Sequence, residues 1–200
     1  MRKLNREEIA KLPKLYESII NELICNNVEF YRFSKTIKWC FGFDDETSIV
    51  AETNRKNNVI TINIKAFMRS LFEDNLITIE YFLLHEIRHV FQHLIISDFE
   101  SGLGLPISEE IVKKWKYEGD HYVKSLLDNG EENPKYFMQD SEMDAYAFSL
   151  SVMEYKYKQN KIKHLYIPPV YGHDFRRLVE EWKDTFEKEN IQIKAKDKNL

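Results

Sequence analysis

The sequence is poor in the residues that mark secreted, disordered or membrane-spanning chains. Only 2 of its 200 residues are cysteine, Cys25 and Cys40, which is too few for a disulfide framework and suggests a reducing compartment. With 6 glycines and 5 prolines, a loop-dominated or disordered chain is not expected. No stretch approaches the ~18 uninterrupted apolar residues of a membrane helix, and the N-terminus lacks the apolar segment and cleavage site of a signal peptide. We therefore expect a cytoplasmic protein without a membrane span.

The sequence also lacks an excess of positively charged residues. The net charge of −4 gives no electrostatic reason to expect binding to nucleic acid. Hydrophobic residues make up 43% of the chain and aromatic residues 14%, which supplies ample material for one core. No repeat or long linker divides the chain, so residues 1–200 are expected to form a single domain. The oligomeric state cannot be predicted.

The hydrophobic patterning predicts an α+β fold. Asn5 and Glu8 form a capping-box pattern before a helix that Pro13 should kink or divide and that should end near Asn26. Four short segments rich in β-branched and aromatic residues, "VEFYRF", "TIKWCFGF", "SIVAET" and "VITINI", then predict a small antiparallel sheet. The alternation in "VITINI" predicts one solvated face. The remaining segments with helical periodicity are the one that carries "YFLLHEIRHVFQH", one from Ser108 toward Asn129-Gly130, "EMDAYAFSLSVMEYKYK" capped by Asp140 or Ser141, and "DFRRLVEEWKDTFEKE".

The stretch "YFLLHEIRHVFQH" carries the strongest chemical signal. His85 and His89 are four residues apart on a predicted helix, so they share one face with their Cβ atoms about 5–6 Å apart. Two imidazoles at that spacing can converge on one ion at about 2.0–2.1 Å from each nitrogen. Paired histidines and a glutamate on a buried helix cost free energy unless they are satisfied, and a metal would satisfy them. We therefore predict a Zn²⁺ site with His85 and His89 as ligands.

The two neighbours of this pair are predicted to play other roles. Glu86 is too close in sequence to be needed as a ligand, and it is placed to act as general base toward a water molecule. His93 continues the row, but it lies about 12 Å from His85 along a straight helix, too far to share one ion. We expect His93 to be a partly exposed polar residue.

A catalytic zinc normally has a third protein ligand. The candidates downstream are His121, Asp140, Glu142, Asp144, His164 and His173. Glu142 stands out because Ala145 and Ser149 share its helix face and would let two helices approach closely. Asp144 points about 200° away from Glu142, so only one of the two can reach the ion, and the other would cap the helix or orient a histidine.

Together, "LLHEIRHVFQ" and "EMDAYAFS" resemble the small zincin metallopeptidases of the gluzincin kind, especially the ImmA/IrrE-like group. The resemblance implies a zincin-like fold in which a small sheet precedes the buried active-site helix. It implies His85, His89 and Glu142 as zinc ligands and Glu86 as general base. It also implies a peptidase with a narrow protein or peptide substrate, held by strand addition to the sheet edge, as in compact enzymes of bacteria and phages. The segment between His89 and Glu142 contains His121, which remains an alternative ligand.

Two other functions remain open. One is a deformylase-like site, in which Cys40 upstream of the histidine pair would be the third ligand. The other is a zincin-fold binding or regulatory protein without hydrolytic activity. A peptidase would also need a donor to the developing oxyanion, for which the candidates are Tyr136, Tyr146, His121 and His173.

Overall fold

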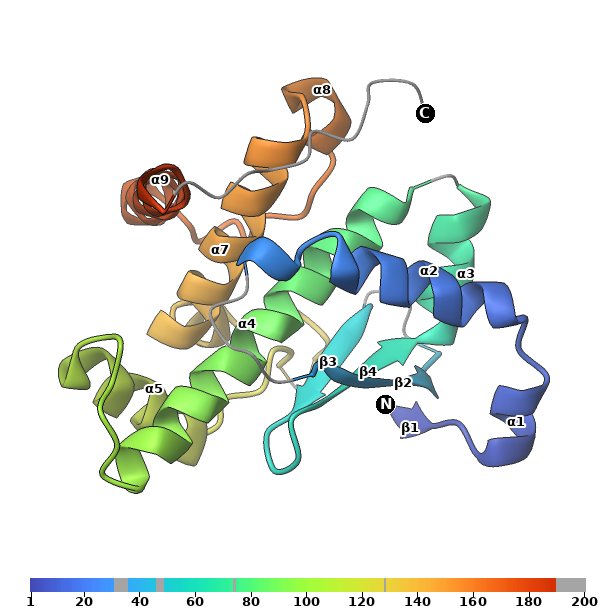
Figure 1. Ribbon diagram of the computed structural model, residues 1–200, viewed down its shortest axis with the longest axis horizontal. Helices are drawn as coiled ribbons and strands as arrows, with labels where there is room; N and C mark the ends of the chain where they lie inside the picture. Colours follow the sequence, from blue (N-terminus) through green and yellow to red (C-terminus); the bar gives the residue numbers. More distant parts are fainter. Residues whose placement is uncertain (31–35, 46–48, 74, 128, 190–200) are drawn as a thin grey trace.

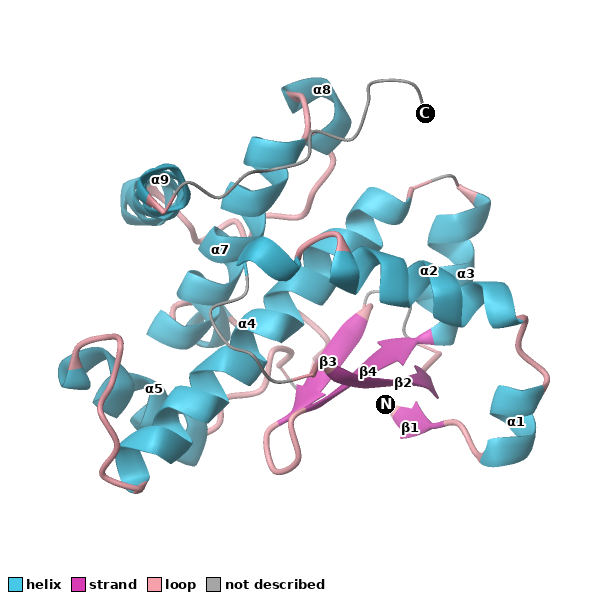
Figure 2. Cartoon of the chain, viewed as in Figure 1, coloured by secondary structure: helices cyan, strands magenta, loops and turns pink. Residues whose placement is uncertain are grey.

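The computed structural model describes residues 1–30, 36–45, 49–73, 75–127 and 129–189, and the following account concerns these residues. The helices are Arg6–Ala10 (α1), Lys14–Cys25 (α2), Ile64–Phe72 (α3), Leu76–Glu100 (α4), Glu109–Asp120 (α5), Pro134–Phe137 (α6), Asp140–Lys156 (α7), Gln159–Ile162 (α8) and His173–Lys188 (α9), with a 3-10 turn (η1) at Val28–Phe30. The strands are Arg2–Lys3 (β1), Lys38–Phe43 (β2), Ala51–Asn54 (β3) and Val59–Asn63 (β4). The predicted mixture of helices with a small sheet is confirmed (Figure 2).

The sheet is mixed, so the prediction of an antiparallel sheet is wrong in part. The strand order is β1-β2-β4-β3. β3 and β4 form an antiparallel hairpin, and β1 runs antiparallel to β2. β4, however, lies between β3 and β2 and pairs with β2 in parallel. This order puts the most apolar strand at the centre of the sheet and leaves β3 at the edge.

The prediction that one face of "VITINI" is solvated is also wrong. Thr61 is 2% exposed and Asn63 is 0% exposed. The burial of Asn63 is possible because both ends of its side-chain amide form hydrogen bonds. The NH₂ group donates to the Ile49 carbonyl at 3.0 Å, and the side-chain oxygen accepts from the backbone amide of Lys65 at 3.1 Å, at the start of α3. A satisfied amide can occupy a buried position that an alternating pattern assigns to solvent.

The first helical segment follows its local signals. Asn5 and Glu8 form the predicted capping box, and Pro13 divides the segment into α1 and α2. α2 ends at Cys25, with Asn26 as its C-cap. Beyond it, the strand predicted at "VEFYRF" is wrong for Val28–Phe30, which form the turn η1; the rest of that segment lies outside the described residues.

The middle helix is shorter than predicted. Ser108 caps α5 as expected, but the helix ends at Asp120 and does not reach Asn129. Glycine is a poor helix former, and Gly119 stands at the end because Arg55 lies across it: a Cβ there would be 1.8 Å from Arg55 Nη1. The β3–β4 turn therefore packs against the last turn of α5.

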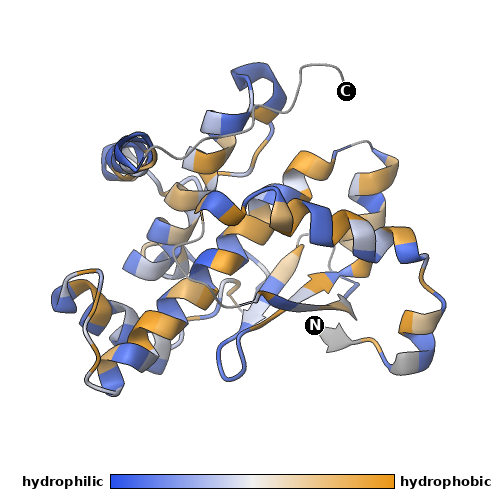
Figure 3. Ribbon diagram, viewed as in Figure 1, coloured by the Kyte–Doolittle hydropathy of each residue, from blue (hydrophilic) through white to orange (hydrophobic). Residues whose placement is uncertain are grey.

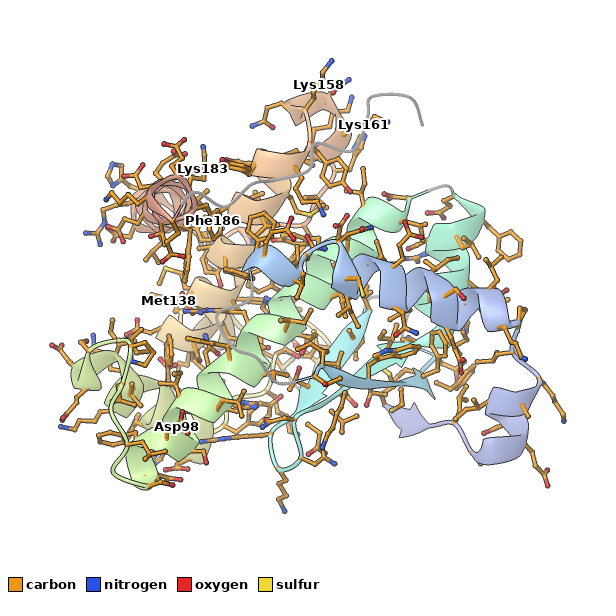
Figure 4. The ribbon with its side chains drawn as sticks, in the orientation of Figure 1. Asp98, Met138, Lys158, Lys161, Lys183 and Phe186 are labelled. Carbon is orange, nitrogen blue, oxygen red and sulfur yellow. The ribbon has the colours of Figure 1, made fainter. Side chains whose placement is uncertain are left out.

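α4 runs through the centre of the molecule (Figure 1). Its buried residues occur on every side of the helix. One set of its residues packs with α2, α3 and the sheet, and another packs with α7 and α9. Its C-terminal half packs with α5. Figure 3 shows apolar residues gathered along α4 and β4, whereas α9 presents much polar surface. On α9, Phe186 is 1% exposed and faces the body of the molecule, while Lys161 of α8 and Lys158 just before it project outward (Figure 4).

A buried polar network joins the ends of α2 and α7 to α4. Glu80 pairs with Lys156, and Asn27 donates to Glu80 Oε1 at 2.8 Å. Tyr157 donates to the other oxygen of Glu80 at 2.6 Å. The network lies near the N-terminal end of α4 and takes no part in the cluster described below.

Among the described residues, no helix is both long enough and apolar enough to cross a membrane.

Candidate metal centre

The structure brings His85 and His89 of α4 together with Glu142 of α7. The two Nε2 atoms of the histidines are 3.0 Å apart. Glu142 Oε2 lies 3.4 Å from His85 Nε2, and Glu142 Oε1 lies 3.3 Å from His89 Nε2. His85 is 4% exposed and Glu142 is 6% exposed. Three donor atoms of the types that bind zinc therefore converge at one buried point.

The packing of α7 on α4 explains why Glu142 reaches the histidine pair. Glu142 lies in the first turn of α7, and Ala145 and Ser149 follow on the same face. Both small residues are 0% exposed, and Ser149 Oγ donates to its own helix at the Ala145 carbonyl, 2.8 Å away. Small side chains let two helix backbones approach closely, so the small-residue face expected from the sequence is confirmed.

The spacing of the donor atoms is compatible with a tetrahedral ion. Ligand atoms about 2.0–2.1 Å from such an ion lie about 3.3 Å from one another. The two histidine nitrogens are 3.0 Å apart, and each lies 3.3–3.4 Å from a different oxygen of Glu142. One ligand atom from each of the three residues lies within 4.8 Å of the other two. Among the described residues, Glu142 Oε2 is buried without a hydrogen-bond partner, as is Nδ1 of His85. A buried carboxylate oxygen without a donor costs free energy, and a bound cation would remove that cost.

Glu142 and His89 also shift each other's protonation. Burial would raise the pKa of Glu142, but the positive charge of His89 and the closeness of both imidazoles hold that pKa well below its usual range. Burial would lower the pKa of His89, yet the charge of Glu142 and its hydrogen bond raise that pKa to about 9. Without a metal, Glu142 is therefore a carboxylate and His89 an imidazolium.

Zinc binding is consequently expected to depend on pH. The ion must displace the proton of His89, whose pKa is raised to about 9. The apparent zinc affinity should therefore increase about tenfold for each pH unit between about pH 7 and pH 8.5, with about one proton released per ion. Competition titrations with a chelator whose own pH dependence is known would measure the slope. A flat profile over this range would contradict the assigned protonation state.

The rival ligands lie elsewhere. Asp144 accepts from Arg88 Nε at 2.7 Å, so its carboxylate is committed to an ion pair. His121 is exposed at the end of α5, and its Nδ1 pairs with the Tyr117 carbonyl at 2.9 Å. Cys40 lies on β2, with its Sγ 3.8 Å from Thr61 Oγ1, and is outside the cluster. His93 is half-buried and pairs with Asn58, as expected of a residue that is not a ligand.

A cleft of about 800 Å³ opens beside the cluster. Glu86, His89 and Glu142 line it, so the carboxylate predicted as general base faces the same space as two of the three donor residues. The edge strand β3 and the turn that follows also line the cleft, together with residues of α5 and of the segment before α7. Thr53 of β3 donates to the backbone carbonyl of Glu86 at 3.0 Å, which fixes the strand beside the helix.

Of the four candidate oxyanion donors, Tyr136 lines the cleft. Burial raises the pKa of its phenol well above the usual value, and the charge of Glu142 adds to this effect. Tyr136 therefore keeps its proton and can donate it in a hydrogen bond. Tyr146 packs instead against the His85 ring, with 4.2 Å between ring centroids. His121 and His173 are exposed, and neither lines the cleft.

Sequence reasoning missed three residues at this site. Gln92 contacts His89, Glu118 binds the start of α7, and Tyr122 lines the cleft. The position of Gln92, three residues after His89 on one helix, was the available signal. Neither Asp140 nor Ser141 is the N-cap of α7, contrary to prediction. The N-cap of α7 is Gln139. The Glu118 carboxylate accepts hydrogen bonds from the backbone amides of Asp140 at 2.6 Å and Ser141 at 3.0 Å.

Comparisons with known proteins add no assignment: no family model, no curated protein and no solved structure matches the chain.

Proposed function

We propose that this protein is a zinc-dependent metallopeptidase with His85, His89 and Glu142 as ligands and Glu86 as general base. The observation that carries the proposal is the convergence of three residues with zinc-type donor atoms, whose nearest contacts to one another are 3.0–3.4 Å, beside a cleft that Glu86 also lines. A histidine pair with a carboxylate gives three protein ligands and leaves a coordination position for water or substrate, the donor set of hydrolytic zinc sites. The proposed site of action is the cytoplasm.

The residues of the cleft would divide the chemistry among them. When bound, zinc supplies a Lewis acid that acidifies water and polarises a carbonyl. Glu86 accepts a proton from the attacking water and passes it to the leaving amine. Tyr136, which keeps its phenolic proton, donates a hydrogen bond to the developing oxyanion. Glu86 and Tyr136 both line this cleft.

The edge strand supports a peptide as the substrate. β3 is one of the two edge strands of the described sheet; its residues Ala51–Asn54 line the cleft, and it is paired with β4 on one side. An extended peptide can add to such an edge through main-chain hydrogen bonds, with side-chain pockets providing specificity. A protein segment presented in extended form therefore fits this cleft.

The proposal is tested by exposing zinc-loaded protein to a diverse peptide library and identifying the products by mass spectrometry. Cleavage at defined sequences is expected, with the Glu86→Gln variant as matched control. If zinc binds stoichiometrically but no peptide is cleaved by the wild-type protein, hydrolysis is refuted and the same fold acts as a binding or regulatory protein.

Glu142 is the ligand with the least support from sequence. Glu142→Ala is expected to lower zinc affinity at least ~100-fold, because it removes one of three ligands that lie about 2.0–2.2 Å from the ion. His121→Ala should leave the affinity within about twofold of wild type, since His121 is exposed on α5. A chelator competition assay measures both. Loss of zinc from His121→Ala with retention in Glu142→Ala would reassign the third ligand.

A further inference from the structure

Gln92 is a buried amide at the junction of α4 and α7, 2% exposed. Its Nε2 donates to the Ser141 carbonyl at 2.9 Å and to Asp144 Oδ2 at 2.9 Å. Its Oε1 lies 2.8 Å from His89 Nδ1. A backbone carbonyl and a carboxylate can only accept, so both partners require the NH₂ group. The orientation of the amide is therefore fixed, with its oxygen toward His89.

This orientation determines which nitrogen of His89 can bind an ion. Oε1 of Gln92 only accepts, so Nδ1 of His89 must carry the hydrogen. In the neutral imidazole the lone pair then lies on Nε2, and Nε2 is the atom that faces His85 and Glu142. Gln92 thus favours the one tautomer of His89 that can act as a ligand toward the cluster.

The same amide also fixes the helix turn that carries Glu142. Ser141, the residue before Glu142, is held from two sides. Gln92 binds its carbonyl, and the Glu118 carboxylate binds its amide at 3.0 Å and its hydroxyl at 2.6 Å. The first turn of α7 is therefore tied to α4 and α5 at the position where Glu142 leaves the backbone.

Asp144 anchors the other end of this arrangement. Besides Gln92, it accepts from Arg88 Nε at 2.7 Å and from Trp182 Nε1 at 3.3 Å. Arg88 is itself buried, with its guanidinium carbon 4.3 Å from the Phe91 ring centroid and 4.5 Å from that of Trp182. Asp144 is thus a rigid acceptor that keeps the Gln92 amide in its orientation.

We infer that Gln92 is a positioning residue that couples two of the three ligands, by presenting Nε2 of His89 and by fixing the turn that carries Glu142. The inference rests on the proposed metal site. Because Gln92 holds both ligands, the site is assembled before an ion arrives, and the ligand side chains need little ordering when the ion binds. Residues that orient zinc ligands typically change metal affinity about 10- to 100-fold when they are replaced.

The test compares Gln92→Met with Asn27→Leu. Asn27 is an equally buried amide, 1% exposed, that bonds Leu23 and Glu80 away from the cluster. Chelator competition on the folded proteins should show a loss of zinc affinity of about 10- to 100-fold for Gln92→Met and a change within about twofold for Asn27→Leu. Both variants should lower thermal stability, so stability alone does not account for the difference.

A second readout needs no variant. The ¹⁵N spectrum of zinc-loaded wild-type protein should show His89 protonated at Nδ1 and metal-bound at Nε2. The opposite tautomer overturns the inference even if zinc binds. It is also overturned if Gln92→Met binds zinc as wild type does, or if Asn27→Leu loses as much affinity. In these cases the metal site stands as long as His89→Ala fails to bind zinc, whereas a wild-type protein that does not bind zinc refutes the proposed function itself.

Discussion

Replacing His85 or His89 by alanine is expected to reduce the zinc content of the purified protein from about one ion per chain to less than about a tenth. Each substitution removes one of three donor atoms, and a zinc site of this kind does not persist with two protein ligands. Elemental analysis after dialysis against a weak chelator measures the content directly. Because the cluster is buried, circular dichroism should accompany it to show that the variants remain folded.

His93→Ala is the matched control for this experiment. His93 lies one turn further along α4, pairs with Asn58 at 3.2 Å and also lines the cleft. The His93→Ala protein should retain about one zinc per chain, because His93 lies outside the cluster of His85, His89 and Glu142. Full zinc content in both His85→Ala and His89→Ala would refute the site.

Glu86→Gln is expected to keep zinc and to lose peptide hydrolysis by a factor of at least ~100. Glutamine has nearly the same shape as glutamate, so the helix and the cluster should be preserved, but it cannot accept a proton from water. The measurement combines the zinc content with kcat on a peptide that the wild-type protein cleaves.

A second acid of the cleft provides the control. Glu52 lies on β3, and its side chain is 48% exposed. Glu52→Gln removes one negative charge from the same cleft and should leave kcat within about threefold. A Glu86→Gln enzyme as active as wild type would contradict the assigned role of Glu86, and loss of zinc from that variant would make Glu86 a ligand.

The features that the sequence predicted well depend on local chemistry. The capping box of Asn5, the break at Pro13 and the helix around His85 each follow from residues within a turn or two of one another. Glu142 was identified from the small residues on its helix face and from a resemblance, and the structure places it against the histidine pair.

The errors concern contacts between segments distant in sequence. No local signal shows that β4 enters between β2 and β3, and this order buries Thr61 on a face predicted to be wet. α5 ends earlier than predicted, and near its end Gly119 packs against Arg55, more than sixty positions upstream. The start of α7 is capped by Glu118 from another helix, where a local cap was expected.

The central claim is that one zinc ion lies between α4 and α7. A crystal structure of the protein grown with one equivalent of zinc, with anomalous scattering measured at the zinc edge, tests it most directly. We predict one strong peak about 2.0–2.2 Å from Nε2 of His85, Nε2 of His89 and a carboxylate oxygen of Glu142. A zinc ion bound elsewhere, or no peak at this cluster in protein that has been shown to be folded, would contradict this claim.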